Sequence, residues 1–346
     1  MNKKTVVVAM SGGVDSSVVA LILKNQGYNV IGLHMSNGNE DEQDFINICK
    51  RLNIEYHIEK YDNQMALVKD YFINSYINGK TPNPCVICNK EVKFTPFLDF
   101  VNKTGADYLA TGHYANIEQI DGKILLCKAK DDLKDQTYFL NQLKQNQLVK
   151  VLFPLGNLTK EDIRKIAQDN NFENAQKKDS FDVCFVGGQK FKHFMQKNYP
   201  DKQGDIVNVD NNKIVGKHSG LSQFTVGQRK GLGIGGQKDI LGKWFVFKKD
   251  LKNNILYVST DEQKLMSSGL IAKNINFINP IEQKTFDCNA KIRYRQQDQQ
   301  VTVDVLDDDK IKVSFKTPQR AIAIGQFVVF YKDNICLGGA EIDEVL

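Results

Sequence analysis

Residues 8–17 read V-A-M-S-G-G-V-D-S-S, and this stretch decides the fold of the first part of the chain. The apolar, β-branched run from Thr5 to Met10 is typical of a buried parallel strand. A second apolar run over 18–23 ends near Gly27, and glycine is favoured just past a helix C-terminus. The pattern therefore predicts a strand, a tight glycine loop and a helix.

The predicted loop is suited to bind an anion. Backbone N–H groups at the start of a helix are unsatisfied, and the helix dipole favours negative charge there. Hydroxyls at Ser11, Ser16 and Ser17 add donors around a phosphate. The stretch lacks the Gly-Lys-Ser/Thr of a P-loop and the third glycine of the dinucleotide fingerprint. We expect a nucleotide site of another class; the structural alternative is a glycine-rich N-cap turn with solvated hydroxyls.

The first half of the chain alternates between strand and helix patterns, which predicts a doubly wound parallel sheet. Ligands of such sheets bind beyond the carboxyl ends of the strands, where Ser11–Gly13, Met35 and Thr111–His113 fall. A hairpin around Asp121-Gly122 and a helix starting near Asp135 extend this unit. The expected strands are 29–35, 55–58 and 107–110, the expected hairpin is 116–128, and the expected helices are 40–52, 62–77, 91–103 and 160–170.

The residue composition and the predicted secondary structure change after Gly204. Glycines become dense and short alternating strands are expected at 243–248 and 255–259. From Ser268 the predicted strands are evenly spaced, with turns such as 307–309, which indicates a small β-barrel. We therefore expect three domains: an α/β domain over 1–200, a central β-rich domain over 201–267 and a C-terminal β-barrel over 268–346.

Bulk composition is that of an ordinary globular protein, with 346 residues, 41% of them hydrophobic. We expect no membrane span, because no apolar run approaches eighteen residues. The N-terminus has no signal-peptide pattern, so the cytoplasm is the expected compartment. A net charge of +5 permits a nucleic-acid partner without requiring one. The seven cysteines do not form a secreted disulfide framework, so catalysis or metal binding is their expected use.

A C-x-x-C pair, Cys85 and Cys88, lies in a proline-containing loop. Such a pair can share a metal, form a redox couple or supply a thiolate nucleophile. A second C-x-x-C is missing from the sequence and its histidines show no paired spacing, which disfavours a zinc site. Cys184 is flanked by polar and glycine residues, and the nearby Lys177 and Lys178 would favour its thiolate. The remaining cysteines are expected to be small core residues: Cys49, Cys127, Cys288 and Cys336.

The S-G-G-V-D-S stretch resembles the pyrophosphate loop of the ATP pyrophosphatases, which split ATP into AMP and pyrophosphate. Further blocks follow in order along essentially the whole chain. Together they resemble the tRNA-specific 2-thiouridylase (MnmA) family. The blocks are N-P-C-V-I-C-N-K-E-V-K-F, A-T-G-H-Y, K-D-Q-T-Y-F-L, D-S-F-D-V-C-F, G-Q-R-K-G-L-G-I and K-I-R-Y-R-Q.

The resemblance implies ATP-dependent replacement of the uridine C2 oxygen by sulfur at wobble position 34 of the tRNAs for Lys, Glu and Gln. ATP with Mg²⁺ would adenylate the oxygen, and a cysteine-borne sulfur would displace AMP. Cys184 would carry the persulfide. Cys88 would act as the nucleophile that releases or relays this sulfur, ending in a disulfide with Cys184. A cysteine desulfurase or a sulfur-relay protein would supply the sulfur.

The same resemblance assigns binding residues, with Asp15 near the metal and Asn83, Pro84 and Cys85 facing the target base. Tyr294 lies between two arginines, which suits base stacking with phosphate contact; a solvated strand face is the alternative for Arg293 and Arg295. The implied ATP contacts are Ala9, Met10, Ser11, Gly12, Gly13, Val14, Asp15, Ser16, Met35 and Gly112, and the further tRNA contacts are His113, Lys134, Asp135, Gln136, Arg293, Tyr294 and Gln326.

One departure from the family pattern leaves a second mechanism open. Many relatives have Asp where this chain has Cys85, so a [4Fe-4S] cluster held by Cys85, Cys88 and Cys184 is an alternative to the persulfide route. Two wider alternatives are a small-molecule ATP pyrophosphatase, which leaves the cysteines and the β-rich region without a role, and a non-catalytic RNA-binding protein, which does not explain Asp15 and the serines of the loop.

Overall fold

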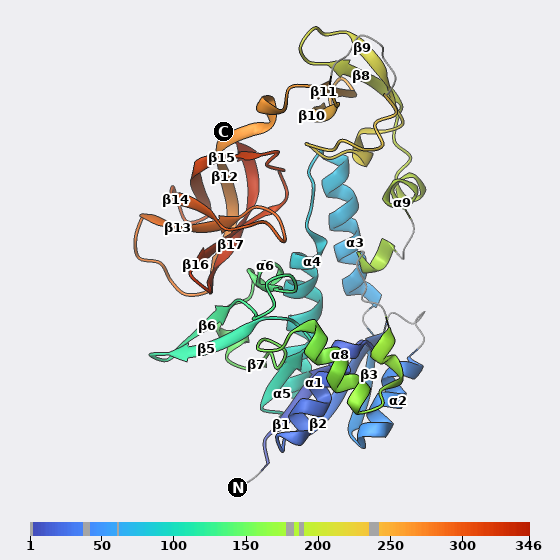
Figure 1. Cartoon of the computed structure of the whole chain (residues 1–346), viewed down its shortest axis with the longest axis vertical. Helices are drawn as coiled ribbons and strands as arrows, with labels where there is room; N and C mark the ends of the chain where they lie inside the picture. Colours follow the sequence, from blue (N-terminus) through green and yellow to red (C-terminus); the bar gives the residue numbers. More distant parts are fainter. Residues whose placement is uncertain (1–2, 37–41, 61, 178–182, 187–189, 235–241) are drawn as a thin grey trace.

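The computed structural model describes residues 3–36, 42–60, 62–177, 183–186, 190–234 and 242–346. The chain forms an elongated molecule, with an α/β layer at one end of its long axis and a small β-sheet at the other (Figure 1). A β-barrel lies beside the helices that connect these two ends. Among the described residues, no helix is long and apolar enough to cross a membrane.

The expected doubly wound sheet is confirmed. Its five strands are all parallel, in the order β3-β2-β1-β4-β7. The chain runs outward from β1 through β2 to β3, and β4 then returns to the other side of β1. Strand order therefore reverses between β1 and β4, and ligands of such sheets bind where it reverses. The strands are β1 (Thr5–Ala9), β2 (Asn29–Ser36), β3 (Glu55–Lys60), β4 (Tyr108–Thr111) and β7 (Val151–Leu152).

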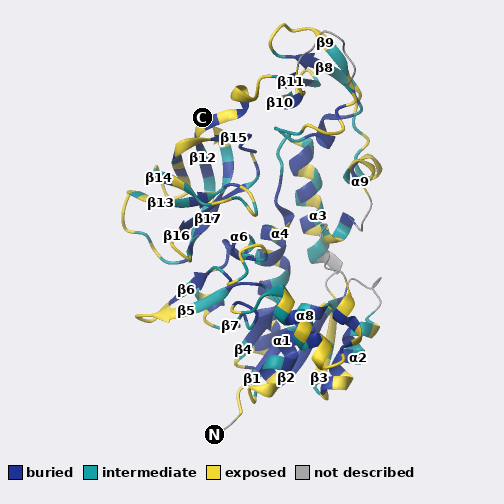
Figure 2. Cartoon of the chain, viewed as in Figure 1, coloured by how far each residue is buried: buried dark blue, intermediate teal, exposed yellow. Residues whose placement is uncertain are grey.

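Helices cover both faces of this sheet, and the side chains of β1 alternate between the two layers. Val7 belongs to one core cluster with α5, whereas Val6 and Val8 belong to another with α1, α2 and α8. Both layers are buried (Figure 2), so the sheet is apolar on its two faces. The helices are α1 (Val14–Asn25), α2 (Gln43–Leu52), α5 (Thr95–Thr104) and α8 (Lys160–Asp169), with the short α7 (Gln145–Leu148) nearby.

The Asp121-Gly122 hairpin forms as expected, with positive φ at both residues. Its strands are β5 (Asn116–Ile120) and β6 (Lys123–Cys127). The expectation that it extends the α/β unit is wrong, however, because β6 pairs with β17 of the barrel and both strands belong to the barrel's sheet. A hairpin signal is local and does not identify the strand that its free edge meets.

The C-x-x-C pair also lies in a different element from the one expected. Pro84 opens a continuous helical run in place of a loop, and proline suits the first position of a helix. A π-helical turn lies inside the run directly before Pro96, whose missing N–H cannot continue an α-helical ladder. We call this run, residues 84–104, the cysteine helix. Its parts are α4 (Pro84–Ile87), η1 (Cys88–Phe94) and α5.

The rest of the chain forms the expected β-rich parts. A four-stranded sheet has the order β10-β11-β8-β9, and six further strands close into a barrel through the β12–β17 pairing. The sheet strands are β8 (Gly204–Asn208), β9 (Ile214–His218), β10 (Phe245–Asp250) and β11 (Ile255–Ser259). The barrel strands are β12 (Met266–Phe277), β13 (Thr285–Lys291), β14 (Gln299–Val305), β15 (Lys310–Arg320), β16 (Phe327–Lys332) and β17 (Ile335–Val345).

The long helix α3 (Asp62–Ile77) connects the α/β layer to the central sheet (Figure 1). Phe72 and Tyr76 on its second half pack against residues of α9. The remaining short helices are α6 (Thr137–Leu140), η2 (Glu173–Gln176), η3 (Cys184–Val186), α9 (Phe191–Asn198), η4 (Leu221–Gln223) and η5 (Glu262–Leu265).

Candidate functional site

The glycine loop lies between β1 and α1, as its sequence predicts. Gly12 has a φ of +72°, a conformation that favours glycine. Gly13 caps α1 without a side-chain hydrogen bond, so no side chain satisfies the first N–H groups of the helix. Ser16 and Ser17 donate to the Gly13 carbonyl at 3.2 and 2.9 Å, so these hydroxyls hold the loop in shape. The loop presents backbone donors in the way that an anion site requires.

A second glycine brings the end of β4 against this loop. A Cβ at Gly112 would lie 3.2 Å from the Ser16 nitrogen and 3.4 Å from the Asp15 Cβ, so only glycine allows this approach without a shift. The predicted ATP-binding residues therefore gather at the carboxyl ends of three neighbouring strands. They are Ala9–Ser16 after β1, Met35 near the end of β2, and Gly112 after β4.

Asp15 is held by two residues that sequence reasoning missed. The Lys160 ammonium contacts its carboxylate oxygens at 2.7 and 2.9 Å, and the Tyr114 hydroxyl donates to it at 2.9 Å. The sequence identified this lysine only as the start of the expected helix 160–170, and in the structure Thr159 and Asp162 form a capping box there. A lysine at the start of a helix gives no indication in the sequence of which distant carboxylate it will contact in the fold.

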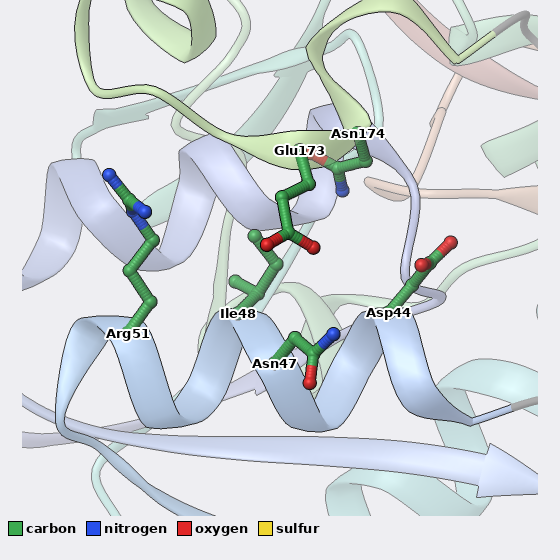
Figure 3. A pocket seen from close by; sticks show the side chains of 6 residues that line it. All are labelled: Asp44, Asn47, Ile48, Arg51, Glu173 and Asn174. Carbon is green, nitrogen blue, oxygen red and sulfur yellow. The ribbon is translucent and has the colours of Figure 1, made fainter.

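Asn174, which sequence reasoning also missed, stabilises the glycine loop through two hydrogen bonds. Its amide donates at 3.0 Å both to the Gly12 carbonyl and to the Ser17 hydroxyl. Asn174 comes from η2, which faces α2 across a small pocket (Figure 3). On the α2 side Asp44 pairs with Lys177 at 2.6 Å. The pocket is lined by Asp44, Asn47, Ile48, Arg51, Glu173 and Asn174.

The fold brings Cys184 towards the C-x-x-C pair. Cys85 is exposed in the first turn of the cysteine helix, and Cys88, one turn later, is buried. Phe185, next to Cys184, packs against the small core cluster that contains Cys88. Burial is the main cause that raises the pKa of Cys85 and of Cys88, and a negative charge on Cys184 would raise both further. The Cys184 side chain is exposed.

Burial raises the pKa of Cys88 to about 11, and the positive charge of Lys93 opposes part of this shift. Cys88 is therefore a thiol at neutral pH in this structure, and its thiolate forms only when the surroundings change. Of the two lysines expected to favour the Cys184 thiolate, Lys177 pairs with Asp44, and Lys178 lies outside the described residues.

Most of the remaining cysteines are buried as expected. Cys49, Cys127 and Cys336 are buried, and Cys288 is half-buried against the barrel core. Burial is the main reason why the pKa of each of these thiols is raised, to about 12 for Cys49. The raised pKa makes these four thiols poor nucleophiles in this structure, but the pKa of Cys88 is raised as far as that of Cys127, so thiol pKa does not single out the reactive cysteines.

The residues expected to contact tRNA near the loop differ in their surroundings. Burial lowers the pKa of His113 well below its usual value, so its imidazole is neutral; Nδ1 lies 2.8 Å from the Thr111 hydroxyl. Asp135 is buried and accepts hydrogen bonds from Ala129 and Thr137. Gln136 accepts the Tyr114 N–H at 2.9 Å. Asp135 and Gln136 therefore make contacts that shape the protein itself.

The expected tRNA contacts of the barrel lie next to the catalytic part of the chain. The Tyr294 ring packs 4.4 Å from Phe139, and Arg295 lies over the Tyr294 ring at 5.2 Å. Arg293 and Arg295 are exposed in a turn just after β13, and not on the strand itself. The expected contact Gln326 donates to backbone carbonyls of residues 81 and 82, just before the cysteine helix.

Comparisons with known proteins cover the whole chain. Family models match residues 4–188 (tRNA methyl transferase HUP domain), 192–260 (tRNA methyl transferase PRC-barrel domain) and 267–342 (aminomethyltransferase beta-barrel domain). A curated relative, tRNA-specific 2-thiouridylase MnmA 1 of Geobacillus kaustophilus, is 47% identical over 100% of this chain and 97% of its own. The chain belongs to the MnmA family. An MnmA of Staphylococcus epidermidis is also 47% identical, over 98% of this chain and 95% of its own.

Solved structures resemble only part of this MnmA-family chain. A predicted subunit of a tRNA methyltransferase from Methanocaldococcus jannaschii has a TM-score of 0.34 at 21% identity, covering 48% of this chain and 74% of its own. Although the family models are described as methyl transferase domains, the curated relatives that match at full length are named thiouridylases. The glycine loop and the C-x-x-C pair are the features that the sequence predicts for the latter name.

The residues present fit some of the groups that the MnmA family implies. Mg²⁺ in nucleotide sites is held by one or two carboxylates together with substrate phosphates. Asp15 is the carboxylate at the loop, with 31% of its side chain exposed, and it would exchange its contact with Lys160 for the metal. By contrast, in the part of the chain that the structure describes, no group of three or more Cys, His, Asp or Glu side chains is arranged to hold a metal. The cysteines thus form no assembled cluster site there.

Proposed function

We propose that this MnmA-family chain replaces the C2 oxygen of uridine 34 with sulfur in the tRNAs for Lys, Glu and Gln, and that it does so in the cytoplasm. As a member of the family it is a tRNA uridine sulfurtransferase that uses ATP. The observation that carries the proposal is the packing of Phe185, beside Cys184, on the core cluster that contains Cys88. This contact brings the segment of Cys184 beside the cluster that contains Cys88, in the domain that also holds the glycine loop.

In the first step the uridine C2 oxygen attacks the α-phosphorus of ATP and pyrophosphate leaves. The N–H groups at the start of α1 and the Lys160 ammonium are the donors that would hold the phosphates. A Mg²⁺ ion bound with Asp15 would neutralise phosphate charge. The oxygen thereby becomes part of an AMP leaving group, which a sulfur nucleophile can displace.

In the second step the Cys88 thiolate attacks the inner sulfur of a Cys184 persulfide. A Cys88–Cys184 disulfide forms and hydrosulfide is released. The hydrosulfide adds to C2 of the adenylated uridine, and AMP leaves with the oxygen. A sulfur donor such as a cysteine desulfurase or a relay protein, together with a thiol reductant, restores the persulfide. Burial raises the pKa of Cys88 to about 11, so this step requires a change in its surroundings that favours the thiolate.

The tRNA would lie across the start of the cysteine helix and the barrel turn that bears Tyr294. The Tyr294 ring, with exposed arginines on both sides, suits stacking and phosphate contact. We propose that the residues facing the target base are Asn83, Pro84 and Cys85, and that the residues touching the rest of the tRNA include His113, Lys134, Arg293 and Tyr294. Asp135 and Gln136 would shape this surface from within, through their hydrogen bonds to neighbouring residues.

The test is thiolation of unmodified glutamate tRNA with ATP, Mg²⁺ and a persulfide source, followed on a mercury-containing gel. Cys88→Ser and Cys184→Ser are expected to abolish the shift, and Cys85→Ser to retain it. Cys288→Ser, in the barrel, is the matched control and is expected to stay active.

Each other outcome identifies an alternative. Loss of thiolation in all three site variants, with a brown anaerobic protein, would support a [4Fe-4S] cluster held by Cys85, Cys88 and Cys184. Pyrophosphate release that does not need RNA would support a small-molecule ATP pyrophosphatase. Absence of any pyrophosphate release, with RNA bound, would support a non-catalytic RNA-binding protein.

A further inference from the structure

The turn between the β5–β6 hairpin and α6 is held in one shape by its own hydrogen bonds. We call this turn, residues 131–136, the Asp131 turn. The Asp135 N–H donates to the Asp131 carbonyl at 2.8 Å. The buried Asp135 carboxylate accepts the Ala129 N–H at 3.0 Å and the Thr137 hydroxyl at 2.7 Å. Because backbone and carboxylate bonds both close the turn, a force on one part of it acts on the whole.

The last residue of the turn, Gln136, makes a reciprocal pair of hydrogen bonds with Tyr114. The Gln136 N–H donates to the Tyr114 carbonyl at 2.8 Å, and the Gln136 Oε1 accepts the Tyr114 N–H at 2.9 Å. The Tyr114 ring is buried in the core cluster that contains α1, and its hydroxyl donates to Oδ1 of Asp15 at 2.9 Å. One buried side chain therefore connects the Asp131 turn to the carboxylate of the glycine loop.

The first residue of the turn, Asp131, is connected to the same carboxylate by a second route. Its Oδ2 accepts the N–H of Lys160 at 3.1 Å, at the start of α8. The Lys160 ammonium in turn contacts both carboxylate oxygens of Asp15, at 2.7 and 2.9 Å. The hydroxyl and the ammonium that hold Asp15 thus belong to two residues, and each of these residues is hydrogen-bonded to one end of the Asp131 turn.

We propose that Tyr114 is a positioning residue, which orients the Asp15 carboxylate for the metal and links it to the Asp131 turn. The Tyr114 hydroxyl bonds only Oδ1, so Oδ2 can face a cation once the Lys160 ammonium has moved to the phosphates. The turn also carries Lys134, an expected RNA contact, so tRNA bound there would act on Asp15 through Tyr114. This inference rests on the proposed function for the RNA contact, but not for the effect of Tyr114 on Asp15.

The test measures binding of a nucleotide and not catalysis. The probe is α,β-methylene-ATP, whose bridging carbon prevents the release of pyrophosphate. Its Kd for the full chain is measured over a range of Mg²⁺ concentrations, with and without unmodified glutamate tRNA. Tyr114→Phe removes the hydroxyl and keeps the buried ring, and Asp131→Ala breaks the second route. Tyr257→Phe makes the same change as Tyr114→Phe on β11, in the central sheet at the other end of the molecule, and is the matched control.

In the wild-type protein we expect tRNA to lower the Kd of the probe with Mg²⁺ at least about fivefold. Tyr114→Phe should reduce this effect of tRNA to less than about twofold, and Asp131→Ala should reduce it in the same direction. Without tRNA, Tyr114→Phe should raise the Mg²⁺ concentration needed for half-maximal binding of the probe about threefold or more, because the carboxylate loses the bond that orients it. Tyr257→Phe should match the wild type in both measurements.

Two results would overturn the inference. An effect of tRNA that is as large in Tyr114→Phe as in the wild type, or that is absent from both although tRNA binds, would overturn the link to the turn. An unchanged Mg²⁺ requirement in Tyr114→Phe would overturn its role in orienting Asp15. If the wild-type protein binds no tRNA, the proposed function fails and the link fails with it, whereas the Mg²⁺ requirement still decides the role of Tyr114 at Asp15.

Discussion

At the scale of single residues, Cys88 and Asp15 are both held in an inactive form in the free protein. Cys88 is buried next to exposed Cys85, and its thiol stays protonated well above neutral pH. The Lys160 ammonium neutralises the Asp15 carboxylate, so the loop carries no uncompensated negative charge when nucleotide is absent. Both features imply that nucleotide and RNA must displace contacts already made in the protein.

The pKa of Cys88 gives a direct prediction for its reactivity. The thiolate is the reactive form, so the alkylation rate of Cys88 in the RNA-free protein should rise with pH to a midpoint near 11. Lys93→Gln removes the charge that lowers this pKa and should move the midpoint to higher pH. Lys103→Gln, an exposed lysine at the end of α5, is the control. A midpoint near the ordinary cysteine value of 9.0 would contradict the account.

The contact between Lys160 and Asp15 gives a second prediction. Lys160→Ala removes the ammonium nearest the loop, and we expect tRNA-dependent pyrophosphate release to fall at least about tenfold at limiting ATP. Lys165→Ala, an exposed lysine on the same helix, should have no effect. Equal ATP dependence of the two variants would show that Lys160 serves only to neutralise Asp15.

At the scale of elements, the sequence predicts what local patterns determine. Apolar runs identify β1, β2 and β4 within one or two residues, the run over 18–23 lies inside α1, and the Asp121-Gly122 turn identifies its hairpin. The expected helix 91–103 lies inside the cysteine helix, but the first part, residues 84–90, was missed because prolines suggest a loop, whereas Pro84 begins a helix. The partners of Asp15 and of the glycine loop were missed because they come from distant segments.

The η2 segment should control how well the loop binds nucleotide. Asn174→Asp keeps the size of the side chain but removes the two hydrogen bonds to Gly12 and Ser17. We expect the KM for ATP to rise about fivefold or more, because loop order is lost before the phosphates bind. Gln176→Glu makes the same chemical change at an exposed position of η2 and is the control. An unchanged KM in Asn174→Asp would indicate that the loop keeps its shape without this support.

At the scale of the whole molecule, the α/β layer and the barrel are joined through many buried contacts. β6 pairs with β17, and the Tyr138 hydroxyl donates to the Phe327 carbonyl at 2.8 Å. Nearby, the Gln142 amide donates to the Gly339 carbonyl at 3.0 Å. Because these contacts cross from one part to the other, the two parts are expected to unfold together.

Tyr138→Phe tests this coupling. The change leaves a buried carbonyl without its donor, so the free energy of unfolding should fall by about 1–2 kcal/mol in a single urea transition. Fluorescence of Trp244, the one tryptophan of the chain, reports unfolding of the central sheet. The urea midpoint of this signal should move less than the midpoint of the α/β layer and the barrel. Two separate transitions for the α/β layer and the barrel would contradict the coupling.

The most direct test of the central claim follows one labelled sulfur atom. Protein carrying a ³⁵S persulfide on Cys184 is mixed with ATP, Mg²⁺ and unmodified glutamate tRNA for a single turnover, and the products are separated. The account predicts that the label moves into tRNA as 2-thiouridine while a Cys88–Cys184 disulfide forms, with one AMP per sulfur transferred. Transfer of the label without that disulfide, or retention of the label on the protein when AMP is released, would contradict it.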